Sequence, residues 1–381
     1  MNKKVIRSAI ALLVILTIGL IISIVVLTKD HSKTEIITIG FSGPLTGEAS
    51  SWGLNAAAGI ELAVNEINAQ GGIDGKQIKL ILEDDTCTSN SVNTVTKLIT
   101  VDSIDGLLGP ICSSSAAPAL PIAVQYNIPT ILPTASAPDL TKLGENIFRV
   151  CPSDTVQGSF AANFLYTKIQ SRKAAVLYVQ NAWGEGLHTV FSKEFILLGG
   201  DVVYSASVSQ EEKDFKTELL KLKQSGADVI YAPVYPSNAI ALFKQMKETN
   251  FEIPVIGGDV LEDDAFKNSP YSEGAMFIVA NTLFSEEFKT KVSHVEGYEN
   301  MELNFVSALG YDAAKVLFAA MEKQELERQK LDKSVVIADL KNTFAEGVSS
   351  KTITFDENGD LKNPAAKVKI IKNHISVVYD D

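Results

Sequence analysis

Two hydroxyl-rich turns in the first half of the chain have the residue types and the positions expected of a site for a small carboxylate. The first runs from Gly109 to Ser115 and the second from Leu132 to Pro138, and each follows an apolar run that predicts a buried strand. Ligands of open parallel sheets bind beyond the carboxyl ends of the strands, where free N–H groups at helix starts favour an anion. The two turns therefore predict a cradle for a carboxylate.

The length and charge of the chain limit its architecture and its partners. A chain of 381 residues is longer than one hydrophobic core usually organises, which predicts two domains. The formal net charge of −12 comes from acids scattered along a sequence that is 46% hydrophobic. This balance disfavours a nucleic-acid partner and indicates a globular rather than a disordered protein.

The N-terminus has the features of an export and membrane-attachment segment. Residues 1–7 are basic, residues 8–28 are almost entirely apolar, and Lys29 follows. Such a stretch reaches about 30 Å as a helix, enough to cross a bilayer. A cleaved signal has a shorter apolar region and a small-x-small site, so we expect an uncleaved anchor rather than a cleaved signal. The positive-inside rule then places residues 1–7 in the cytoplasm and the chain after Lys29 outside it, in the periplasm or at the cell surface.

Two of the three cysteines follow neighbouring predicted strands. Cys87 follows the strand at 78–85, and Cys112 follows the strand at 106–108. They either form a disulfide or remain two buried thiols, and the extracytoplasmic location favours the disulfide. Cys151 has no evident partner and is expected to be a small core residue.

The pattern of strands and helices predicts α/β architecture. Apolar runs and amphipathic segments alternate through the first 260 residues, which is typical of doubly wound parallel sheets with helices on both faces. A strand-like segment at 276–280, a helix at 305–327 and strand-like segments from 352 onward follow. If these late segments complete the two earlier sheets, the chain crosses between two lobes three times. The predicted strands lie at 36–40, 78–85, 106–108, 130–131, 174–179, 201–206, 228–231 and 255–257, and the predicted helices at 54–69, 90–100, 114–126, 185–198, 214–224 and 237–249.

Short segments of small, polar and aromatic residues follow many of these strands in a fixed order. They are Ile39 to Gly47, Glu66 to Gly75, Asp84 to Cys87, Cys112 to Ser115, Thr134 to Pro138, Trp183 to Gly186, Asp214 to Phe215, Gly257 to Asp259 and Asp356 to Asp360. Together they resemble the leucine/isoleucine/valine-binding proteins, the type I periplasmic substrate-binding proteins of amino-acid ABC transporters. The resemblance implies two α/β lobes joined by three crossovers that close on a ligand by a hinge. It places lobe 1 at 35–152 plus 283–348 and lobe 2 at 153–282 plus 349–381.

The resemblance also implies how a ligand is held. Ser113 and Ser136 would bind the α-carboxylate, and the Thr134 carbonyl would accept from the α-ammonium. Asp259 would pair with that ammonium from the second lobe. The alternatives are that the three hydroxyl residues are helix N-caps and that Asp259 is a turn acid.

Aromatic residues are expected to form the walls of the same pocket. Trp52 and Trp183 lie beside glycines in predicted loops and correspond to positions that are aromatic in relatives, with Tyr235 nearby. Tyr235 could instead pack at a strand end. Tryptophan at the wall positions, where many branched-chain binders carry tyrosine, leaves the identity of the ligand open.

Enzyme motifs and metal-ligand spacings are not found in the sequence. It contains no nucleophile elbow, Walker loop, dinucleotide fingerprint or zinc-protease motif, and its four histidines are far apart. A nucleophilic Ser113 or Ser114 with His188 as base is the best enzyme hypothesis, but no pattern connects these residues. We therefore expect a non-enzyme without a cofactor that binds an amino acid or similar small carboxylate and works with an ABC transporter permease. The alternative is a sensory ectodomain that works with a separate membrane receptor.

Overall fold

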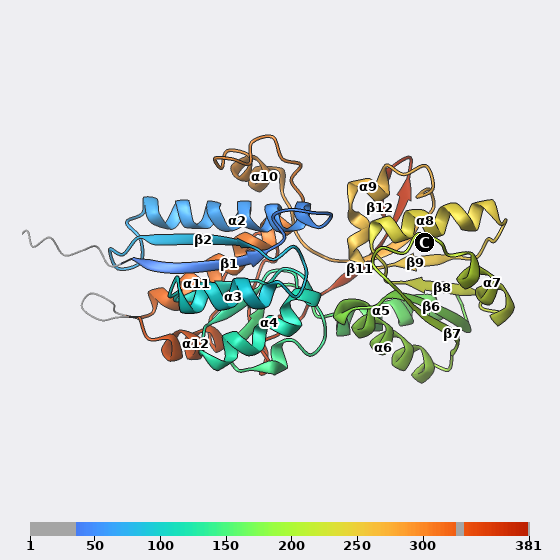
Figure 1. Ribbon diagram of the computed structural model, residues 1–381, viewed down its shortest axis with the longest axis horizontal. Coiled ribbons are helices and arrows are strands. Elements are labelled where there is room, and N and C mark those ends of the chain that lie inside the picture. The colour runs from blue at the N-terminus through green and yellow to red at the C-terminus, as the bar shows by residue number, and fades with distance from the viewer. Residues whose placement is uncertain (1–35, 325–330, 380–381) are drawn as a thin grey trace, which may run out of the picture.

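Two sheets, each covered by helices on both faces, divide the chain into two lobes (Figure 1). The computed structural model describes residues 36–324 and 331–379. Both sheets are built mainly from parallel strands joined by helices, which confirms the predicted α/β class. The expected membrane segment at 8–28 lies outside the described residues. Among the helices that are described, none is long and apolar enough to span a bilayer.

The first lobe contains a five-stranded parallel sheet. Its strands carry apolar residues on both faces, as expected of a parallel sheet that is covered on both sides. Helices α2, α11 and α12 cover one face, and α3 and α4 cover the other. In spatial order the strands are β2 (Ile78–Asp84), β1 (Ile37–Gly43), β3 (Gly106–Leu108), β4 (Thr130–Leu132) and β5 (Ile147–Arg149), and the helices are α2 (Ser50–Ala69), α3 (Ser91–Thr100), α4 (Ser113–Gln125), α10 (Glu286–Val292), α11 (Val306–Glu322) and α12 (Lys333–Lys341).

Small residues bring α2 and α11 unusually close together. A Cβ atom added to Gly59 would lie 1.9 Å from the Ser307 carbonyl oxygen, and one added to Gly310 would lie 2.3 Å from the Ala56 carbonyl oxygen. Glycine at these two positions lets the backbones touch. Helix α11 is therefore fixed directly against α2, although more than 200 residues separate the two helices in the sequence.

The second lobe contains a seven-stranded mixed sheet. Strands β6 to β10 are parallel, whereas β11 pairs antiparallel with both β10 and β12. Helices α5 and α6 cover one face, and α7 and α8 cover the other. In spatial order the strands are β12 (Ile375–Val378), β11 (Ala366–Lys372), β10 (Met276–Ala280), β9 (Val255–Gly257), β8 (Val229–Ala232), β6 (Lys173–Val179) and β7 (Asp201–Val208), and the helices are α5 (Asp154–Thr167), α6 (Ala182–Leu197), α7 (Lys216–Ser225), α8 (Pro236–Glu248) and α9 (Asp264–Lys267).

The chain crosses between the lobes three times. The first crossing joins β5 to α5, the second joins β10 to α10, and the third leads into β11 (Figure 1). The third crossing occurs later than the resemblance implied, because Ile353, Phe355 and Leu361 are buried in the core of lobe 1. The ring of Phe355 lies 5.1 Å from that of Phe148 in β5. Residues 353–361 therefore belong with lobe 1, and the expected lobe 2 segment at 349–381 begins too early.

Other differences from the sequence prediction are local. The segment at 352–355 makes isolated bridges rather than a strand, and α11 ends at Glu322 rather than at residue 327. Strand β5 and helix α5 lie between residues 131 and 174, an interval for which the sequence predicted no strand or helix. These two elements lie at the first crossing and bear on the site described below.

Candidate functional site

A cavity of about 310 Å³ lies between the lobes, at the carboxyl ends of both sheets. In lobe 1 its residues follow β1, β2, β3 and β4, and in lobe 2 they follow β6, β7, β8 and β9. This is the position expected for ligands of open α/β sheets. All seven residues that the sequence singled out for ligand binding line this cavity: Trp52, Ser113, Thr134, Ser136, Trp183, Tyr235 and Asp259.

The two hydroxyl-rich turns are tied together by one side chain. Ser113 is the first residue of α4, and its Oγ accepts hydrogen bonds from the N–H groups of Ser136 and Ala137, both at 3.1 Å. The hydroxyl hydrogen of Ser113 remains free for a further acceptor. The first N–H groups of α4 have no carbonyl partner within the helix and add positive potential. The first lobe thus offers a fixed set of neutral donors, while the Thr134 hydroxyl is used elsewhere, donating to the Ile111 carbonyl at 2.7 Å.

A disulfide forms the floor of this cradle. Cys87 and Cys112 are bonded, with Cα atoms 5.5 Å apart, and both line the cavity. Cys112 precedes the first turn of α4, so the bond holds the start of this helix to the end of β2. The predicted pairing is confirmed, and Cys151 is a buried free thiol as expected.

Aromatic side chains of the second lobe form one wall. The rings of Trp183 and Tyr235 stack with centroids 5.6 Å apart, and Asn181 donates to the Tyr235 hydroxyl at 3.0 Å. The Trp183 indole also covers Gly258, where a Cβ atom would lie 2.9 Å from the ring. On the opposite lobe, Trp52 packs edge-on against Phe305 with centroids 5.8 Å apart. The three aromatic residues are therefore held by their own lobes.

Asp259 supplies negative charge to the cavity from the second lobe. It begins the short helix after β9, and its N–H donates to the Gln157 side chain at 3.2 Å. The oxygen Oδ1 is buried and accepts no hydrogen bond from the part of the chain that the structure describes. Burial raises the pKa of Asp259 to about 6. A cationic group of a ligand is the partner that such a carboxylate lacks.

A second buried carboxylate, which the sequence analysis missed, lies close to Asp259. Asp154 starts α5 and is fully buried, and none of the described residues donates to its Oδ2 atom. Burial and then the charge of Asp259 raise the pKa of Asp154 well above its usual value. The hydroxyl of Tyr231 is also buried without a partner, and both carboxylates raise its pKa further. The only signal in the sequence was an acid directly after Ser153, a residue that caps α5.

Asp259 also lines a small chamber next to the main cavity. The chamber measures about 20 Å³ and shares Trp52, Thr134, Ser136 and Asp259 with the main cavity. A volume of this size holds one water-sized group. The chamber thus has room for one small group beside the Asp259 carboxylate, such as an ammonium.

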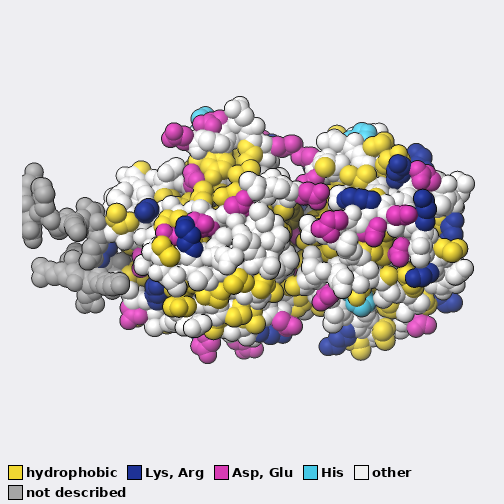
Figure 2. Space-filling model, viewed as in Figure 1, with side chains coloured by type: hydrophobic (Ala, Val, Ile, Leu, Met, Phe, Trp, Pro, Cys, Tyr) yellow, Lys and Arg dark blue, Asp and Glu magenta, His cyan; other side chains and the backbone are white. Residues whose placement is uncertain are grey.

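Charged side chains around the main cavity are all acidic. Glu48, Asp259 and Asp263 line it, and its lining contains no lysine, arginine or histidine. Figure 2 shows further Asp and Glu side chains on the second lobe beside the junction of the lobes. A ligand with excess negative charge is disfavoured by this arrangement.

Catalytic and metal-binding arrangements are not found among the described residues. Within the ranges 36–324 and 331–379, no three His, Cys, Asp or Glu side chains gather as a metal site would require. His188, the only base suggested for Ser113, stacks on Tyr178 at 4.4 Å and contacts Ser205 Oγ at 3.1 Å. It does not line the cavity. The geometry is that of a binding site.

Comparison with known sequences gives one consistent group of relatives. A family model described as periplasmic binding protein matches residues 36–374. The Leu/Ile/Val-binding protein homolog 3 of Brucella melitensis is 28% identical over 332 residues, covering 86% of this chain and 89% of that protein. A protein of Pseudomonas aeruginosa named amino acid binding protein is 30% identical over 266 residues, 69% of each chain.

Solved structures show the same fold. A branched-chain amino acid transporter substrate binding protein of Streptococcus pneumoniae, in complex with isoleucine, superposes with a TM-score of 0.76 at 25% identity. The match covers 91% of this chain and 99% of that one. A solute binding protein of an ABC transporter from R. palustris, in complex with benzoate, gives a TM-score of 0.75 at 22% identity over 90% and 95% of the two chains.

Proposed function

We propose, since the chain belongs to the periplasmic binding protein family, that it is an extracytoplasmic binding protein that captures an amino acid between two closing lobes and delivers it to an ABC transporter. Members of this family bind solutes and are not enzymes. The transporter, the N-terminal anchor and the location outside the cytoplasm are part of the proposal. They are supported by the family and by the apolar segment at 8–28.

One observation carries the choice of an amino acid. The two lobes offer complementary halves of a zwitterion site, with neutral donors around Ser113 in lobe 1 and the carboxylate of Asp259 in lobe 2. A ligand carboxylate would accept from the Ser113 hydroxyl and from the N-terminus of α4. The ammonium of the same ligand would then lie toward Asp259 and the Thr134 carbonyl, at the small chamber.

The net charge of the buried acids in the site matches that of one ammonium group. Asp259, with a pKa of about 6, is mostly ionised at pH 7, whereas burial and then the charge of Asp259 raise the pKa of Asp154 and disfavour its ionised form. Two carboxylates at close range do not both ionise readily in a buried site. The two buried acids of the second lobe, Asp154 and Asp259, therefore present one net negative charge, which matches the single ammonium of an amino acid with a neutral side chain.

Aromatic acids such as benzoate are the competing ligand class, because a related fold binds benzoate. Benzoate would satisfy the donors around Ser113 and would stack on Trp183. It has no group for the Asp259 carboxylate, which would remain buried and charged without a partner. Since an unpaired buried charge is costly, the site favours a zwitterion over a simple carboxylate.

The side-chain part of the cavity is apolar and narrow. Trp52, Trp183 and Tyr235 line it, with Ile240 and Val260 between them. This lining favours an aliphatic or flat aromatic side chain, and the volume of about 310 Å³ limits the ligand to a small molecule.

A thermal-shift panel tests the proposal. The purified chain is heated with each of the twenty amino acids and, separately, with benzoate and 4-hydroxybenzoate. A ligand present at one hundred times its Kd stabilises the folded state by about 2.7 kcal/mol, which gives a clear rise in Tm. We expect at least one amino acid with a neutral side chain to give such a rise and the benzoates to give none. Stabilisation by the benzoates alone would refute the zwitterion site.

A further inference from the structure

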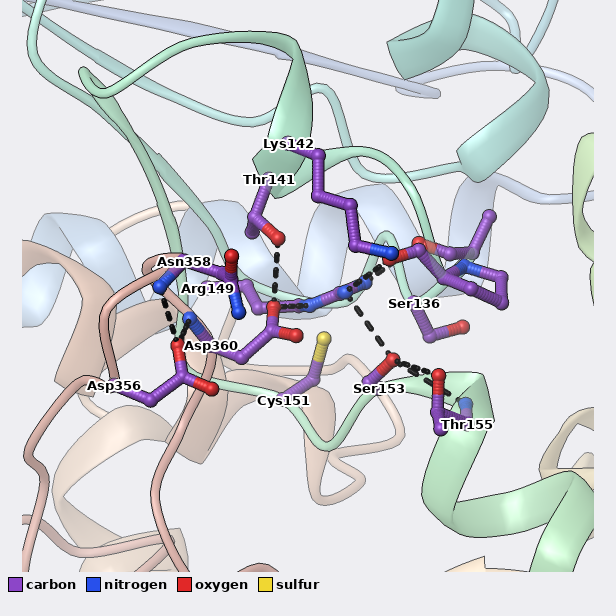
Figure 3. Close-up of polar contacts among 12 residues, drawn as sticks. Ser136, Thr141, Lys142, Arg149, Cys151, Ser153, Thr155, Asp356, Asn358 and Asp360 are labelled. Carbon is purple, nitrogen blue, oxygen red and sulfur yellow. Dashed lines mark hydrogen bonds and ion pairs between the residues drawn. The ribbon is translucent and has the colours of Figure 1, made fainter.

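A buried arginine lies behind the carboxylate cradle without reaching the cavity. Arg149 is the last residue of β5, its side chain is fully buried, and it is not part of the cavity lining. Figure 3 shows its side chain extending from β5 between the turn that contains Ser136 and the turn that contains Asp360. No sequence motif marks Arg149, and its side chain does not contact the ligand site directly.

Every side of the guanidinium is occupied. Nη1 donates to the Ala137 carbonyl at 2.7 Å and makes a longer contact of 3.5 Å with the Ala135 carbonyl. Nη2 donates to the Pro138 carbonyl at 3.1 Å and to Ser153 Oγ at 3.2 Å (Figure 3). The planar guanidinium thus contacts three carbonyl groups of one turn, those of Ala135, Ala137 and Pro138. A lysine has a single point charge and cannot reproduce this fork.

The remaining donor fixes the arginine from the opposite side. Its Nε donates to Asp360 Oδ1 at 2.6 Å, and the Thr141 hydroxyl donates to the same oxygen at 2.8 Å. Asp360 is itself held in a tight turn, since its N–H donates to Asp356 Oδ1 at 2.9 Å. The Arg149 backbone N–H also donates to the Gly359 carbonyl at 3.0 Å. The segment before the third crossing therefore sets where the guanidinium lies.

The geometry of the peptide unit links these contacts to the ligand site. In a trans peptide the C=O and the following N–H point in opposite directions. The Ala135 carbonyl faces Arg149, and the N–H of the same peptide, that of Ser136, donates to Ser113 Oγ. The next peptide is held likewise, because the Ser136 carbonyl accepts from the Asp154 N–H while the Ala137 N–H donates to Ser113 Oγ. Arg149 and the Asp154 N–H thus hold the carbonyls on one side of these peptides. Their contacts orient the N–H groups on the other side, which fix the position of Ser113 Oγ.

The same arginine reaches the first crossing. Ser153, which accepts from Nη2, caps α5 by accepting from the Thr155 N–H at 3.2 Å. Helix α5 carries Asp154 and Gln157, and Gln157 accepts from the Asp259 N–H. Arg149 is therefore connected to the turn that binds the carboxylate and to the helix beside the ammonium site.

We propose that Arg149, anchored by Asp360, is a positioning residue that orients the carboxylate-binding turn and couples it to the hinge. This proposal rests on the proposed amino-acid function, because its effect is measured on the carboxylate of the ligand. A purely structural ion pair would stabilise the fold but would not distinguish one ligand head group from another. A positioning role predicts a loss that is specific to the carboxylate.

The test compares two ligands that differ only at that group. The probes are the amino acid that stabilises the wild-type chain most in the thermal-shift panel and the carboxamide of the same amino acid. Their Kd values are measured by calorimetry on wild type and on Arg149→Lys. We expect the Kd of the amino acid to rise about tenfold and that of the carboxamide to change less than about threefold. Equal changes for both ligands, or no change for either, would overturn the proposal.

Two further variants keep the test decisive. Asn146→Ala is the matched control, because Asn146 is a buried residue of the same lobe that donates to the Ala123 and Ile128 carbonyls, away from the cavity. It should lower Tm and leave the ratio of the two Kd values unchanged. Asp360→Asn keeps the arginine. It should lower about threefold the preference for the amino acid over its carboxamide, measured as the ratio of their Kd values. This variant decides the matter if Arg149→Lys does not fold. Failure of the wild type to bind any amino acid would instead count against the proposed function.

Discussion

The two halves of the cleft are built on different principles. In lobe 1 the polar groups of the carboxylate cradle are neutral and bonded to one another, as Ser113 is to the N–H groups of Ser136 and Ala137. In lobe 2 two buried acids lie close together, and neither Asp259 Oδ1 nor Asp154 Oδ2 accepts a hydrogen bond from any described residue. The first half has a fixed geometry before a ligand arrives, whereas the second half has a charge that needs a partner.

This difference suggests how closure is driven. A ligand held by its carboxylate on lobe 1 carries its ammonium toward lobe 2, where it satisfies Asp259. Only an interaction that is stronger in the closed form can favour closure. The lobe 2 acid supplies that interaction, and the lobe 1 cradle supplies most of the initial attachment. The following changes test this division of roles.

Removing the charge of Asp259 should have the largest effect. Asp259→Asn leaves the ligand ammonium buried without its counter-charge, which should cost about 2 to 5 kcal/mol of binding free energy. The loss should be much smaller for the keto acid that matches the amino acid, since it has no ammonium. Calorimetric Kd values for both ligands provide the measurement.

The matched control for this variant is Asp263→Asn. Asp263 lines the outer part of the same cavity but caps α9, accepting from the Ala265 N–H. It should leave the preference for the amino acid over the keto acid intact. If the two asparagine variants behaved alike, Asp259 would have no special role in recognising the ammonium.

Breaking the cradle should have the next largest effect. Ser113→Ala removes the hydroxyl donor and releases the two N–H groups that Ser113 holds, so amino acid and keto acid should both lose about 1.5 to 3 kcal/mol of binding free energy. Ser115→Ala is the control, because the Ser115 hydroxyl donates to the Cys112 carbonyl and does not line the cavity. If Ser113→Ala weakened binding of the amino acid much more than binding of the keto acid, as is expected of Asp259→Asn, the division of roles between the lobes would be contradicted.

Lowering the pH should weaken binding by a smaller factor. With a pKa of about 6, Asp259 is about ten times less ionised at pH 5 than at pH 7, so the affinity for an amino acid should fall about tenfold. For the ligand-free protein, the effect of pH on stability has the opposite sign to its effect on affinity. Because the folded-state pKa lies above the unfolded value, the folded state binds more protons, and the free energy of unfolding should rise as the pH falls from 7 toward 4.

The Asp259→Asn variant separates this pH effect from other titrations. Its affinity should be lower at pH 7 but should depend much less on pH between 7 and 5. Asp154, whose pKa is also raised by burial, shifts the stability of the ligand-free protein with pH in the same direction as Asp259 does. A wild-type affinity that does not change across this interval would show that the Asp259 carboxylate does not receive the ammonium.

Changing the aromatic wall should have the smallest effect. Trp183→Phe shortens the ring that stacks on Tyr235 and covers Gly258, and should weaken binding by about 0.5 to 1.5 kcal/mol. The loss should grow with the size of the ligand side chain and should not differ between amino acid and keto acid. Equal losses for glycine and for a large amino acid would place Trp183 outside the side-chain pocket.

Much of the lobe 1 half could be predicted from the sequence. Its turns follow short apolar strands at fixed spacing, so Ser113, Thr134 and Ser136 were recognisable as neighbours at one edge of a sheet. The disulfide could be predicted for the same reason, because its cysteines also follow adjacent strands. Patterns of this kind lie within short segments and in the order of these segments along the chain, so they are visible in the sequence.

The missed features depend on contacts between distant segments. Asp154 becomes buried only because β5 and α5 bring it beside Asp259, a residue more than one hundred positions away. Likewise, Arg149 gains its role from Asp360, which the third crossing brings back to lobe 1. The late position of that crossing depends on the packing of Phe355 against Phe148. Periodicity within a segment contains no information on such pairings.

The central claim is that a single ligand must engage both lobes through two different charges. The most direct test measures small-angle scattering of the purified chain with three saturating ligands: an amino acid, the keto acid without the ammonium and the amine without the carboxylate. The radius of gyration should decrease with the amino acid and should remain that of the ligand-free protein with the other two. An equal decrease with the keto acid would contradict the claim that Asp259 and the ammonium drive closure.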